Sequence, residues 1–303
     1  MINNTVWLDS NDNLIQSHGG CVLKVDDTYF WYGENKDAKM KGDRVDFLGF
    51  NCYSSKDLKS FKFEGLAFDV KKTSATEISV DAVGERPKVV FNKKTNKFVM
   101  WFHLDDKTYH FAKIGIATCD TPNGNFVYHG YLHALARFDM RVDTRDLTLF
   151  QDDDEVFLVA SCNWNSSMLI AKLSDDYLDL NGEFKIVLKE QFREAPVVIK
   201  ENGKYFMFSS GCTGWEPNAT LYAIADQMFG AWKLVDNPCV GDGARKSFGC
   251  QTAFALKIDQ QWFIAFDKWN PKDLKMSGYT FLPLQISENG AEIQWTDTFE
   301  ANR

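Results

Sequence analysis

The sequence predicts an all-β fold, and more specifically a five-bladed β-propeller, from three observations. Aromatic residues make up 15% of the 303 residues, and short runs rich in Val, Ile, Phe, Tyr and Trp alternate with polar turns, as is typical of strands. Long amphipathic helical stretches are hard to find. One strand–turn–strand pattern then recurs five times along the chain, which a generic β-sandwich, the alternative all-β fold, would not require.

Each copy of this pattern is a short apolar strand, a polar turn and an aromatic-rich strand. The copies lie at residues 21–34, 88–103, 147–161, 195–210 and 252–267. Their turns, such as Asp26-Asp27 and Asn202-Gly203, suit hairpin connections. A second pair of strands is expected after each hairpin, at residues 50–65, 115–130, 169–184, 221–234 and 281–295. Each unit is therefore expected to be a four-stranded antiparallel blade, and a ring of blades lets each one cover its neighbours.

The composition excludes several classes of function. With 34 Lys and Arg against 42 Asp and Glu, the formal net charge is −8, which argues against a nucleic-acid or anionic-membrane partner. No apolar run approaches the ~18 residues that a membrane helix needs, and the first residues do not resemble a secretory signal. We therefore expect a cytoplasmic protein. The oligomeric state is not predicted.

Cofactors and metals are not expected. The seven cysteines form no CxxC pair, so they are interpreted as small buried side chains in a reducing compartment and not as zinc ligands. The chain contains no Gly-rich phosphate loop, dinucleotide fingerprint or GxSxG elbow. Only eight residues follow Trp295, so residues 1–303 are expected to form one catalytic propeller with no appended carbohydrate-binding module.

The register of the repeat selects one polar residue in each blade. These residues lie 11 positions before the first aromatic of the second strand, or 13 in the second blade, whose turn is longer. They are His18, Glu85, Asp146, Glu194 and Gln251. Because the first strand of every propeller blade lines the axis, equivalent positions are expected to converge at one mouth of the central channel.

Three converging carboxylates are suited to acid–base chemistry. Like charges and partial burial raise the pKa of at least one group and leave another ionised, which provides an acid and a base at neutral pH. The alternative is that these groups only solvate the channel entrance. Arg86, Arg145 and Arg193 flank the carboxylates in three blades and can pair across blades to position them.

The segments that carry these residues resemble glycoside hydrolase family 43, and within it the branch of the exo-β-1,3-galactanases. They cover residues 14 to 295 in order. The resembling motifs are HGG (18–20), WYGENK (31–36), CYSSKDL (52–58), ERPKVVFN (85–92), TRDLTLFQDDD (144–154), REAPVV (193–198), SSGCTGWEPN (209–218), CQTAF (250–254) and DKWNPKDL (267–274). The resemblance implies a five-bladed propeller and hydrolysis with inversion.

The resemblance also implies residue roles. Glu194 matches the general acid, Asp146 the carboxylate that tunes and orients it, and Glu85 a carboxylate that binds the nonreducing sugar. The family's usual base, an Asp at the start of the first blade, is absent, and the segment reads Ser17-His18-Gly19-Gly20. In the galactanase branch a Gln of the fifth blade stands opposite the acid, and Gln251 matches it.

The group that activates water remains open at this point. Inversion requires an acid and a water-activating group about 6.5–9.5 Å apart, so that a water fits between them. A neutral amide such as Gln251 is a poor base, but it can hold water through its carbonyl or act as an imidic acid, as the resemblance implies. Glu85 is the chemical alternative, followed by His18 or no base at all.

Sugar-binding residues are expected around the same mouth. Glu34 and Tyr109 resemble sugar contacts of the family, and His18 also belongs to this group. Trp215 can form a stacking platform or belong to the core, whereas Trp164 is not assigned. The other candidates follow second strands and are Asn163, Asn165 and Thr213.

The sequence thus predicts an inverting, exo-acting β-1,3-galactanase or β-galactosidase that acts on an oligosaccharide, with β-1,3-linked galactose as the expected sugar. Another family specificity, α-L-arabinofuranosidase or β-xylosidase, is the first alternative. A sugar-binding propeller without catalytic activity is the second.

Overall fold

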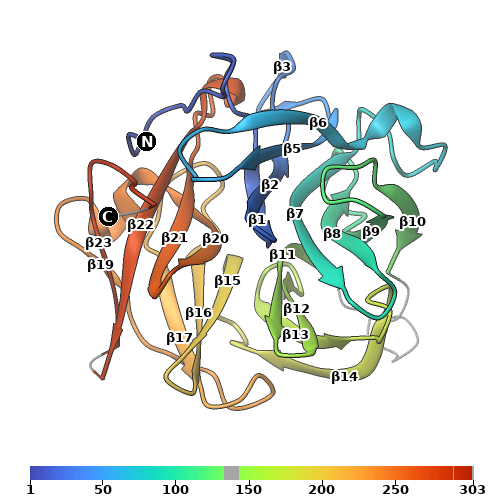
Figure 1. Ribbon diagram of the computed structural model, residues 1–303. Helices are drawn as coiled ribbons and strands as arrows, with labels where there is room; N and C mark the ends of the chain where they lie inside the picture. The colour runs from blue at the N-terminus through green and yellow to red at the C-terminus, as the bar shows by residue number, and fades with distance from the viewer. Residues whose placement is uncertain (133–142, 289, 302–303) are drawn as a thin grey trace.

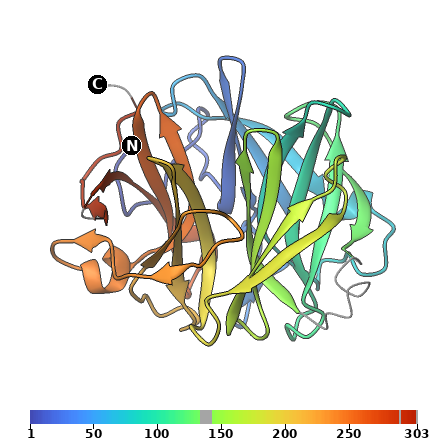
Figure 2. The same cartoon turned by 90° about the horizontal axis from the view of Figure 1, so that it is seen from below.

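The computed structural model describes residues 1–132, 143–288 and 290–301. Five antiparallel sheets of four or more strands follow one another around a ring in chain order (Figure 1). The five-bladed β-propeller expected from the repeat is therefore confirmed. The strands of neighbouring blades run from one end of the molecule to the other, as the turned view shows (Figure 2).

The first two blades contain the expected hairpins and outer strands. The first consists of β1 (His18–Val25), β2 (Thr28–Glu34), β5 (Gly49–Ser55) and β6 (Lys62–Asp69). The second consists of β7 (Val83–Asn92), β8 (Lys97–Asp105), β9 (Lys113–Cys119) and β10 (Val127–Tyr131). A small hairpin of β3 (Met40–Lys41) and β4 (Arg44–Val45) is inserted in the first blade. The sequence patterns did not reveal this insertion.

The third and fourth blades repeat the same order of strands. The third consists of β11 (Thr144–Asp152), β12 (Glu155–Cys162), β13 (Ser167–Leu173) and β14 (Leu180–Val187). The fourth consists of β15 (Arg193–Glu201), β16 (Lys204–Gly211), β17 (Leu221–Ala225) and β18 (Lys233–Leu234).

The fifth blade differs from the expected four-stranded sheet. From the axis outward, four of its strands are β20 (Gln251–Ile258), β21 (Gln261–Lys268), β22 (Gly278–Ser287) and β23 (Gly290–Gln294). A fifth strand, β19 (Cys239–Val240), pairs in parallel with β23 at the outer edge. Three short 3₁₀ helices complete the described structure: η1 (Val70–Lys72), η2 (Ala244–Gly249) and η3 (Leu274–Met276). No helix in the described ranges combines the length and the apolar character required to span a membrane.

Inner strands begin with an irregularity that aims side chains at the axial mouth. The hairpin register shifts near the start of β1, β7, β11, β15 and β20. Two of the shifted residues, Arg86 and Ala195, have left-handed backbone angles with φ of 52° and 53°. A β-bulge of this kind redirects a side chain that a regular strand would point along the pleat.

Apolar packing between blades holds the ring together. Trp31 on β2 is fully buried and its ring lies 4.8 Å from Tyr279 and 5.1 Å from Phe61, so it joins the first and fifth blades. Trp101 on β8 is also fully buried and packs with strands of the third blade. Both tryptophans thus belong to the core between blades.

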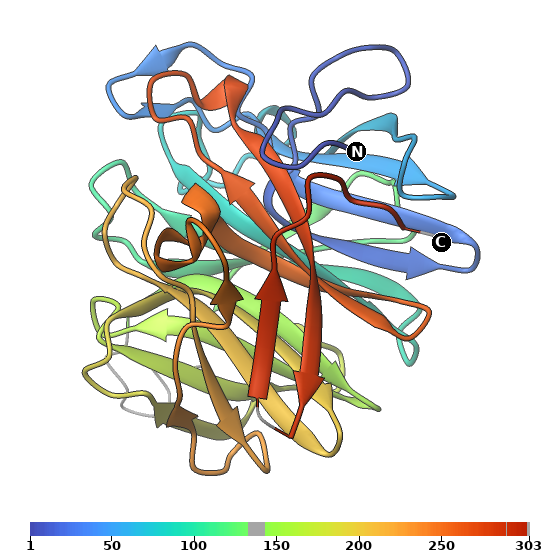
Figure 3. The same cartoon turned by 90° about the vertical axis from the view of Figure 1, so that its left-hand side faces the viewer.

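The N-terminal segment closes the ring beside the fifth blade. Thr5 forms a bridge with Tyr279, and Ile2 forms one with Thr298. The amino group of Met1 donates a 3.1 Å hydrogen bond to the Phe299 carbonyl. The N-terminal segment consequently lies next to the last described residues (Figure 3).

Candidate active site

A pocket of about 540 Å³ lies at the axial mouth where the inner strands begin. Its walls come from all five blades. Four of the five residues chosen from the repeat register line it: Glu85, Asp146, Glu194 and Gln251. The expected convergence at one mouth is therefore observed for these four.

Glu194, at the start of β15, is the carboxyl group most suited to carrying a proton. Burial and then the charge of Asp146 raise the pKa of Glu194 to about 8, although Arg86 acts in the opposite direction. Its Oε2 also accepts a long, 3.4 Å hydrogen bond from Asn165 Nδ2. A carboxyl group with such a pKa is protonated at neutral pH and can donate its proton.

Gln251, at the start of β20, contacts Glu194 directly. Its Nε2 donates 3.0 Å hydrogen bonds to Glu194 Oε1 and to Ser210 Oγ. Its Oε1 accepts hydrogen bonds of 2.8 Å from Arg86 Nη2 and 3.0 Å from Trp269 Nε1. Both amide hydrogens and both carbonyl lone pairs are therefore engaged, which fixes the orientation of the side chain.

Arg86 lines the pocket and connects four blades. Its Nε lies 2.8 Å from Asp146 Oδ2. Nη2 donates to Gln251, Nη1 donates a 3.0 Å hydrogen bond to the Thr252 carbonyl, and the backbone N of Arg86 donates a 2.9 Å bond to Glu34 Oε1. The guanidinium is largely buried, so these protein contacts compensate most of its charge.

The expected pairing of arginines with carboxylates across blades holds for Arg86 alone among the three. Arg145 forms an ion pair with Asp143, two positions before it in the same blade. Arg193 donates to the side chain and carbonyl of Ser209. Arg193 thus binds backbone of its own blade, whereas Arg145 also donates a hydrogen bond from Nη2 to the Tyr109 carbonyl of the second blade.

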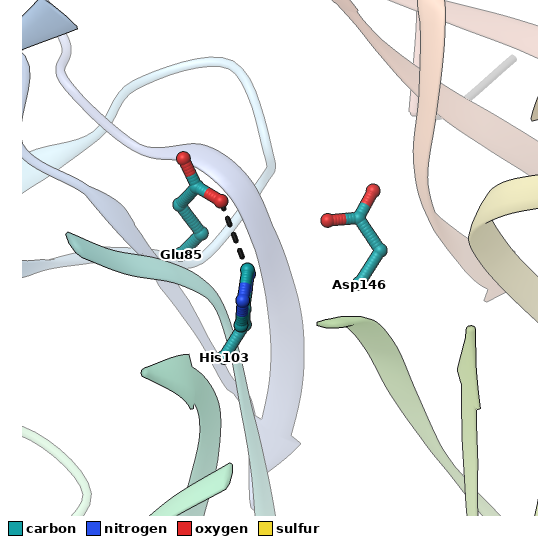
Figure 4. A group of neighbouring side chains, drawn as sticks. All are labelled: Glu85, His103 and Asp146. Atoms are coloured by element: carbon teal, nitrogen blue, oxygen red, sulfur yellow. Dashed lines mark hydrogen bonds and ion pairs between the residues drawn. The ribbon is translucent and has the colours of Figure 1, made fainter. Parts of the chain in front are cut away.

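Glu85 and the buried His103 form an ion pair on adjacent strands (Figure 4). His103 Nδ1 lies 3.1 Å from Glu85 Oε2, and its Nε2 lies 3.0 Å from Asp105 Oδ2. Burial disfavours the imidazolium, but the hydrogen bonds to Asp105 and Glu85 raise the pKa of His103 to about 9. Burial likewise opposes ionisation of Glu85, but the hydrogen bond and charge of His103 lower the pKa of Glu85 to about 2.

Glu85, His103 and Asp146 also form the group of side chains that could hold a cation. One ligand atom of each lies within 4.8 Å of the others, and Figure 4 shows Asp146 facing the Glu85–His103 pair. However, both nitrogens of His103 already contact carboxylates, so the ring has no free lone pair to offer a metal. The imidazolium itself supplies the positive charge that balances the carboxylates of Glu85 and Asp105.

The remaining predicted sugar contacts divide into two groups. Glu34, Tyr109, Asn165 and Trp215 line the pocket. Glu34 Oε2 lies 2.6 Å from Lys36 Nζ, and Tyr109 donates a 2.8 Å hydrogen bond to Glu85 Oε1.

His18, Asn163 and Thr213 do not line the pocket. His18 is fully buried, with Nδ1 3.1 Å from Asp267 Oδ1 and its ring stacked 4.7 Å from that of Tyr279. His18 therefore does not reach the pocket in this structure, because packing against the fifth blade encloses it, and its role in sugar binding or water activation stays a prediction. Thr213 donates to the Glu216 carbonyl and shapes its own loop, and Asn163 lies exposed in a turn.

Sequence reasoning missed several residues of the site. Trp269 and Lys36 line the pocket, and His103, Ser210 and Asp267 contact the residues that were predicted. A signal for the last three was present. Like Glu34, they lie five positions after the first aromatic of the second strand, at or next to the point where that strand pairs with the mouth residue.

Comparison with protein families identifies the family of this chain. The model of the glycosyl hydrolases family 43 matches residues 18–285. The chain belongs to glycosyl hydrolase family 43. It is therefore a glycoside hydrolase by family, as the motifs predicted.

Solved structures of similar family members cover nearly the whole chain. A family 43 β-1,3-galactosidase solved with galactodeoxynojirimycin is 33% identical, with a TM-score of 0.91, and the match covers 99% of this chain and 100% of that one. An exo-β-1,3-galactanase from Phanerochaete chrysosporium, a variant solved with β-1,3-galactotriose, is 31% identical with a TM-score of 0.89. That match covers 98% of this chain and 67% of the other.

A curated relative matches a smaller part. The β-D-galactofuranosidase xynD of Aspergillus niger is 33% identical over 128 residues, which are 41% of this chain and 36% of that protein. The match thus spans little more than a third of that curated relative.

Proposed function

We propose that this protein is an inverting, exo-acting β-galactosidase of the β-1,3-galactanase type, which releases galactose from the nonreducing end of β-1,3-linked galacto-oligosaccharides. The five blades act together as one catalytic domain. Support for the substrate comes from the similar proteins, two of which are described as β-1,3-galactosidase and exo-β-1,3-galactanase.

The observation that carries the proposal is the position of Glu194, which lines the pocket close to the charge of Asp146. The pKa of Glu194, raised to about 8, keeps the carboxyl group protonated at neutral pH, so it can protonate the leaving glycosidic oxygen. Asp146 is ion-paired with Arg86 and accepts a 3.0 Å hydrogen bond from the backbone N of Ala195, the residue that follows the acid. Asp146 therefore orients the backbone that carries Glu194.

Two side chains of the pocket can hold the attacking water. Gln251 can do so through its amide once substrate displaces one of its present partners, because all four of its hydrogen-bonding positions are engaged in this structure. Glu85 is ionised, and each of its oxygens accepts one hydrogen bond in this structure, so it keeps lone pairs for water or a sugar hydroxyl.

Polar and aromatic side chains around these groups suit a galactose ring. Glu34, Lys36 and Tyr109 offer charged and hydroxyl contacts. Trp215 and Trp269 also line the pocket and form an edge-to-face pair with centroids 5.4 Å apart, and Lys36 Nζ lies 5.8 Å from the centroid of the Trp269 ring. Aromatic faces stack on the apolar face of a sugar, while the charged groups fix its hydroxyls.

Product analysis by NMR tests the proposal. β-1,3-Galactobiose and β-1,3-galactotriose are incubated with the protein, and the first galactose signal is followed over time. Release of α-galactose from the nonreducing end supports substrate class, exo action and inversion together. β-Galactose as the first product contradicts inversion, and random internal cleavage contradicts exo action.

Other substrates distinguish the alternative specificities. A β-galactofuranoside deserves inclusion because of the curated relative, and arabino- and xylo-oligosaccharides test the α-L-arabinofuranosidase and β-xylosidase readings. Turnover of one of these, without turnover of galactobiose, contradicts the proposed substrate. Calorimetric binding of galactosides without any hydrolysis identifies a sugar-binding propeller instead.

We also propose that the enzyme acts in the cytoplasm on imported oligosaccharides. All seven cysteines are free, which fits a reducing compartment. Fractionation of cells that express the native gene, followed by detection of the protein, tests this location; recovery outside the cytoplasm contradicts it.

A further inference from the structure

We propose that Trp164 forms a sugar-stacking platform for the leaving side of the substrate, at the rim of the pocket. The inference rests on the proposed function. Trp164 was not assigned from sequence, and it is 63% exposed, which is unusual for the largest apolar side chain. Its position, its rigid turn and its stacking with Arg145 carry the proposal.

The position of Trp164 follows from its neighbours in the pocket wall. It lies in the turn after β12, directly before Asn165, which lines the pocket and contacts Glu194. Arg145, whose guanidinium lies against the Trp164 ring, also lines the pocket. The general acid must contact the leaving oxygen, so the leaving sugar lies on the side of Glu194 and extends toward this rim.

The turn that carries Trp164 holds the backbone in an unfavourable conformation. Asn163, Trp164 and Asn165 are three consecutive left-handed residues, with φ of 53°, 56° and 60°. Non-glycine residues in this region are strained, and bulky ones such as tryptophan more than asparagine. The backbone N–H of Trp164 is held by both carboxylate oxygens of Asp143, at 3.1 and 2.9 Å. The contacts that hold this turn therefore stabilise an exposed aromatic ring in a fixed place.

One face of the ring is occupied by a cation. The Arg145 guanidinium carbon lies 4.4 Å from the ring centroid, and its Nη2 donates a 3.2 Å hydrogen bond to the Tyr109 carbonyl. The His110 ring approaches edge-on, with centroids 5.6 Å apart. These contacts fix the ring without covering it, since most of its surface stays exposed. A preorganised aromatic face loses little conformational entropy when a ligand stacks on it.

The occupant that fits is a pyranose ring on the leaving side of the scissile bond. A galactose presents an apolar patch of C–H bonds on one face and hydroxyls around its edge. The C–H patch matches the open aromatic face of Trp164, and the hydroxyls can reach Arg145 and Asn165 at the pocket wall. Trp164 itself does not line the pocket, but its chain neighbour Asn165 and its stacking partner Arg145 do, so a β-1,3-linked chain whose terminal residue is in the pocket would pass over it.

Chain-length dependence tests the platform. kcat/KM is measured for wild type, Trp164→Ala and Trp164→Tyr on β-galactosyl fluoride, galactobiose and galactotriose. β-Galactosyl fluoride has no leaving sugar, so it reports whether the pocket itself is intact. We expect Trp164→Ala to keep wild-type kcat/KM on the fluoride and to lose about tenfold on galactotriose. Trp164→Tyr, which keeps an aromatic face, should recover most of the loss.

A matched control is Phe63→Ala, another exposed aromatic residue (42%) that lies on the outer strand β6 of the first blade. It should behave as wild type on all three substrates. A loss confined to galactotriose places the platform at the second leaving-side sugar, and a loss on both oligosaccharides places it at the first; either supports the proposal.

Two results overturn the inference. One is wild-type kcat/KM of Trp164→Ala on both oligosaccharides. The other is an equal loss on the fluoride and on galactotriose, which would make Trp164 a structural residue of the pocket. A wild-type protein that releases no galactose from any of the substrates contradicts the proposed function itself, and so is distinguishable from both. Binding of galactotriose to Glu194→Gln, with and without Trp164→Ala, provides a second measurement: equal affinities again count against the platform.

Discussion

Gln251 Nε2 donates a 3.0 Å hydrogen bond to Glu194 Oε1, so the proposed acid and the glutamine predicted to stand opposite it are in direct contact in this structure. The same amide is held by Arg86, Trp269 and Ser210. The distance leaves no space for a water between the two side chains, whereas inversion needs a separation of about 6.5–9.5 Å between acid and water-activating group. Gln251 or Glu194 must therefore move when substrate enters, or Glu85 must hold the water.

Chemical rescue distinguishes Gln251 from Glu85. Removing the water-activating group should lower kcat by about 10²–10⁴-fold with little change in KM. Azide, a nucleophile that needs no base, should restore turnover of that variant and yield α-galactosyl azide. The variants are Gln251→Ala and Glu85→Ala. Rescue of the first assigns Gln251 to the water, and rescue of the second assigns Glu85; a variant that only loses sugar binding shows a raised KM and no azide product.

The alkaline limb of the pH profile should report Glu194. Because its pKa is raised to about 8, kcat/KM should fall as the pH rises through about 8, when the acid loses its proton. Asp146→Asn removes the negative charge that raises the pKa of Glu194. It also removes the ion-pair partner of Arg86, so the positive charge of Arg86 acts more strongly on Glu194, and both effects favour the ionised acid. The alkaline limb should therefore move to lower pH. An unchanged limb in Asp146→Asn would contradict the electrostatic role of Asp146.

His103 should control the acid limb through Glu85. The charge and hydrogen bond of the imidazolium lower the pKa of Glu85 to about 2. In His103→Gln the charge is lost while burial remains, so the pKa of Glu85 should rise and activity should be lost at a higher pH than in wild type. The control is His129→Gln, because His129 is exposed on the outer strand β10 and does not line the pocket. If wild type and His103→Gln lose activity at the same acidic pH, ionisation of Glu85 does not control the reaction.

The pH dependence of thermal stability should show that burial of Glu194 destabilises the folded protein at high pH. Since the folded-state pKa of Glu194 is raised, the folded protein keeps a proton that the unfolded chain releases above its ordinary carboxyl pKa. The favourable contribution of this proton is complete at low pH and is lost as the pH rises through about 8. Glu194→Gln has no proton to release, so its Tm should exceed that of wild type by on the order of a few degrees at pH 8.5, and by less at pH 5. Thermal unfolding at the two pH values measures this; an equal difference at both would refute the linkage.

Trp31 should be essential for closing the ring. It is fully buried and contacts aromatic residues of the first and fifth blades. Trp31→Ala should lower the free energy of unfolding by about 3–5 kcal/mol, through lost burial and the cavity that remains. Trp262, which is half-buried on β21 near the turn of the fifth-blade hairpin, is the control. Trp262→Ala should lower the free energy of unfolding by less than Trp31→Ala. Denaturant unfolding followed by circular dichroism gives both values.

The repeat was sufficient to predict the blades and the positions of most mouth residues. Blade count, hairpin positions and the register of Glu85, Asp146, Glu194 and Gln251 depend on periodic local patterns, which are read directly along the chain. The same register selected His18, whose side chain is enclosed next to the pocket and does not line it. Whether an axial side chain opens into the pocket or is enclosed depends on packing against the neighbouring blade, and here Tyr279 and Asp267 cover His18.

The sequence alone therefore determined the architecture and the set of acidic groups, since both follow from short-range periodicity. Only the tertiary structure decided which of these groups touch. The four contacts of Gln251, the link that Arg86 makes between blades, and the raised pKa of Glu194 all arise between residues far apart in the chain. The left-handed turn that exposes Trp164 likewise depends on Asp143 and Arg145. Such contacts are set by side-chain conformations and bulges in adjacent blades, and no periodic pattern encodes them.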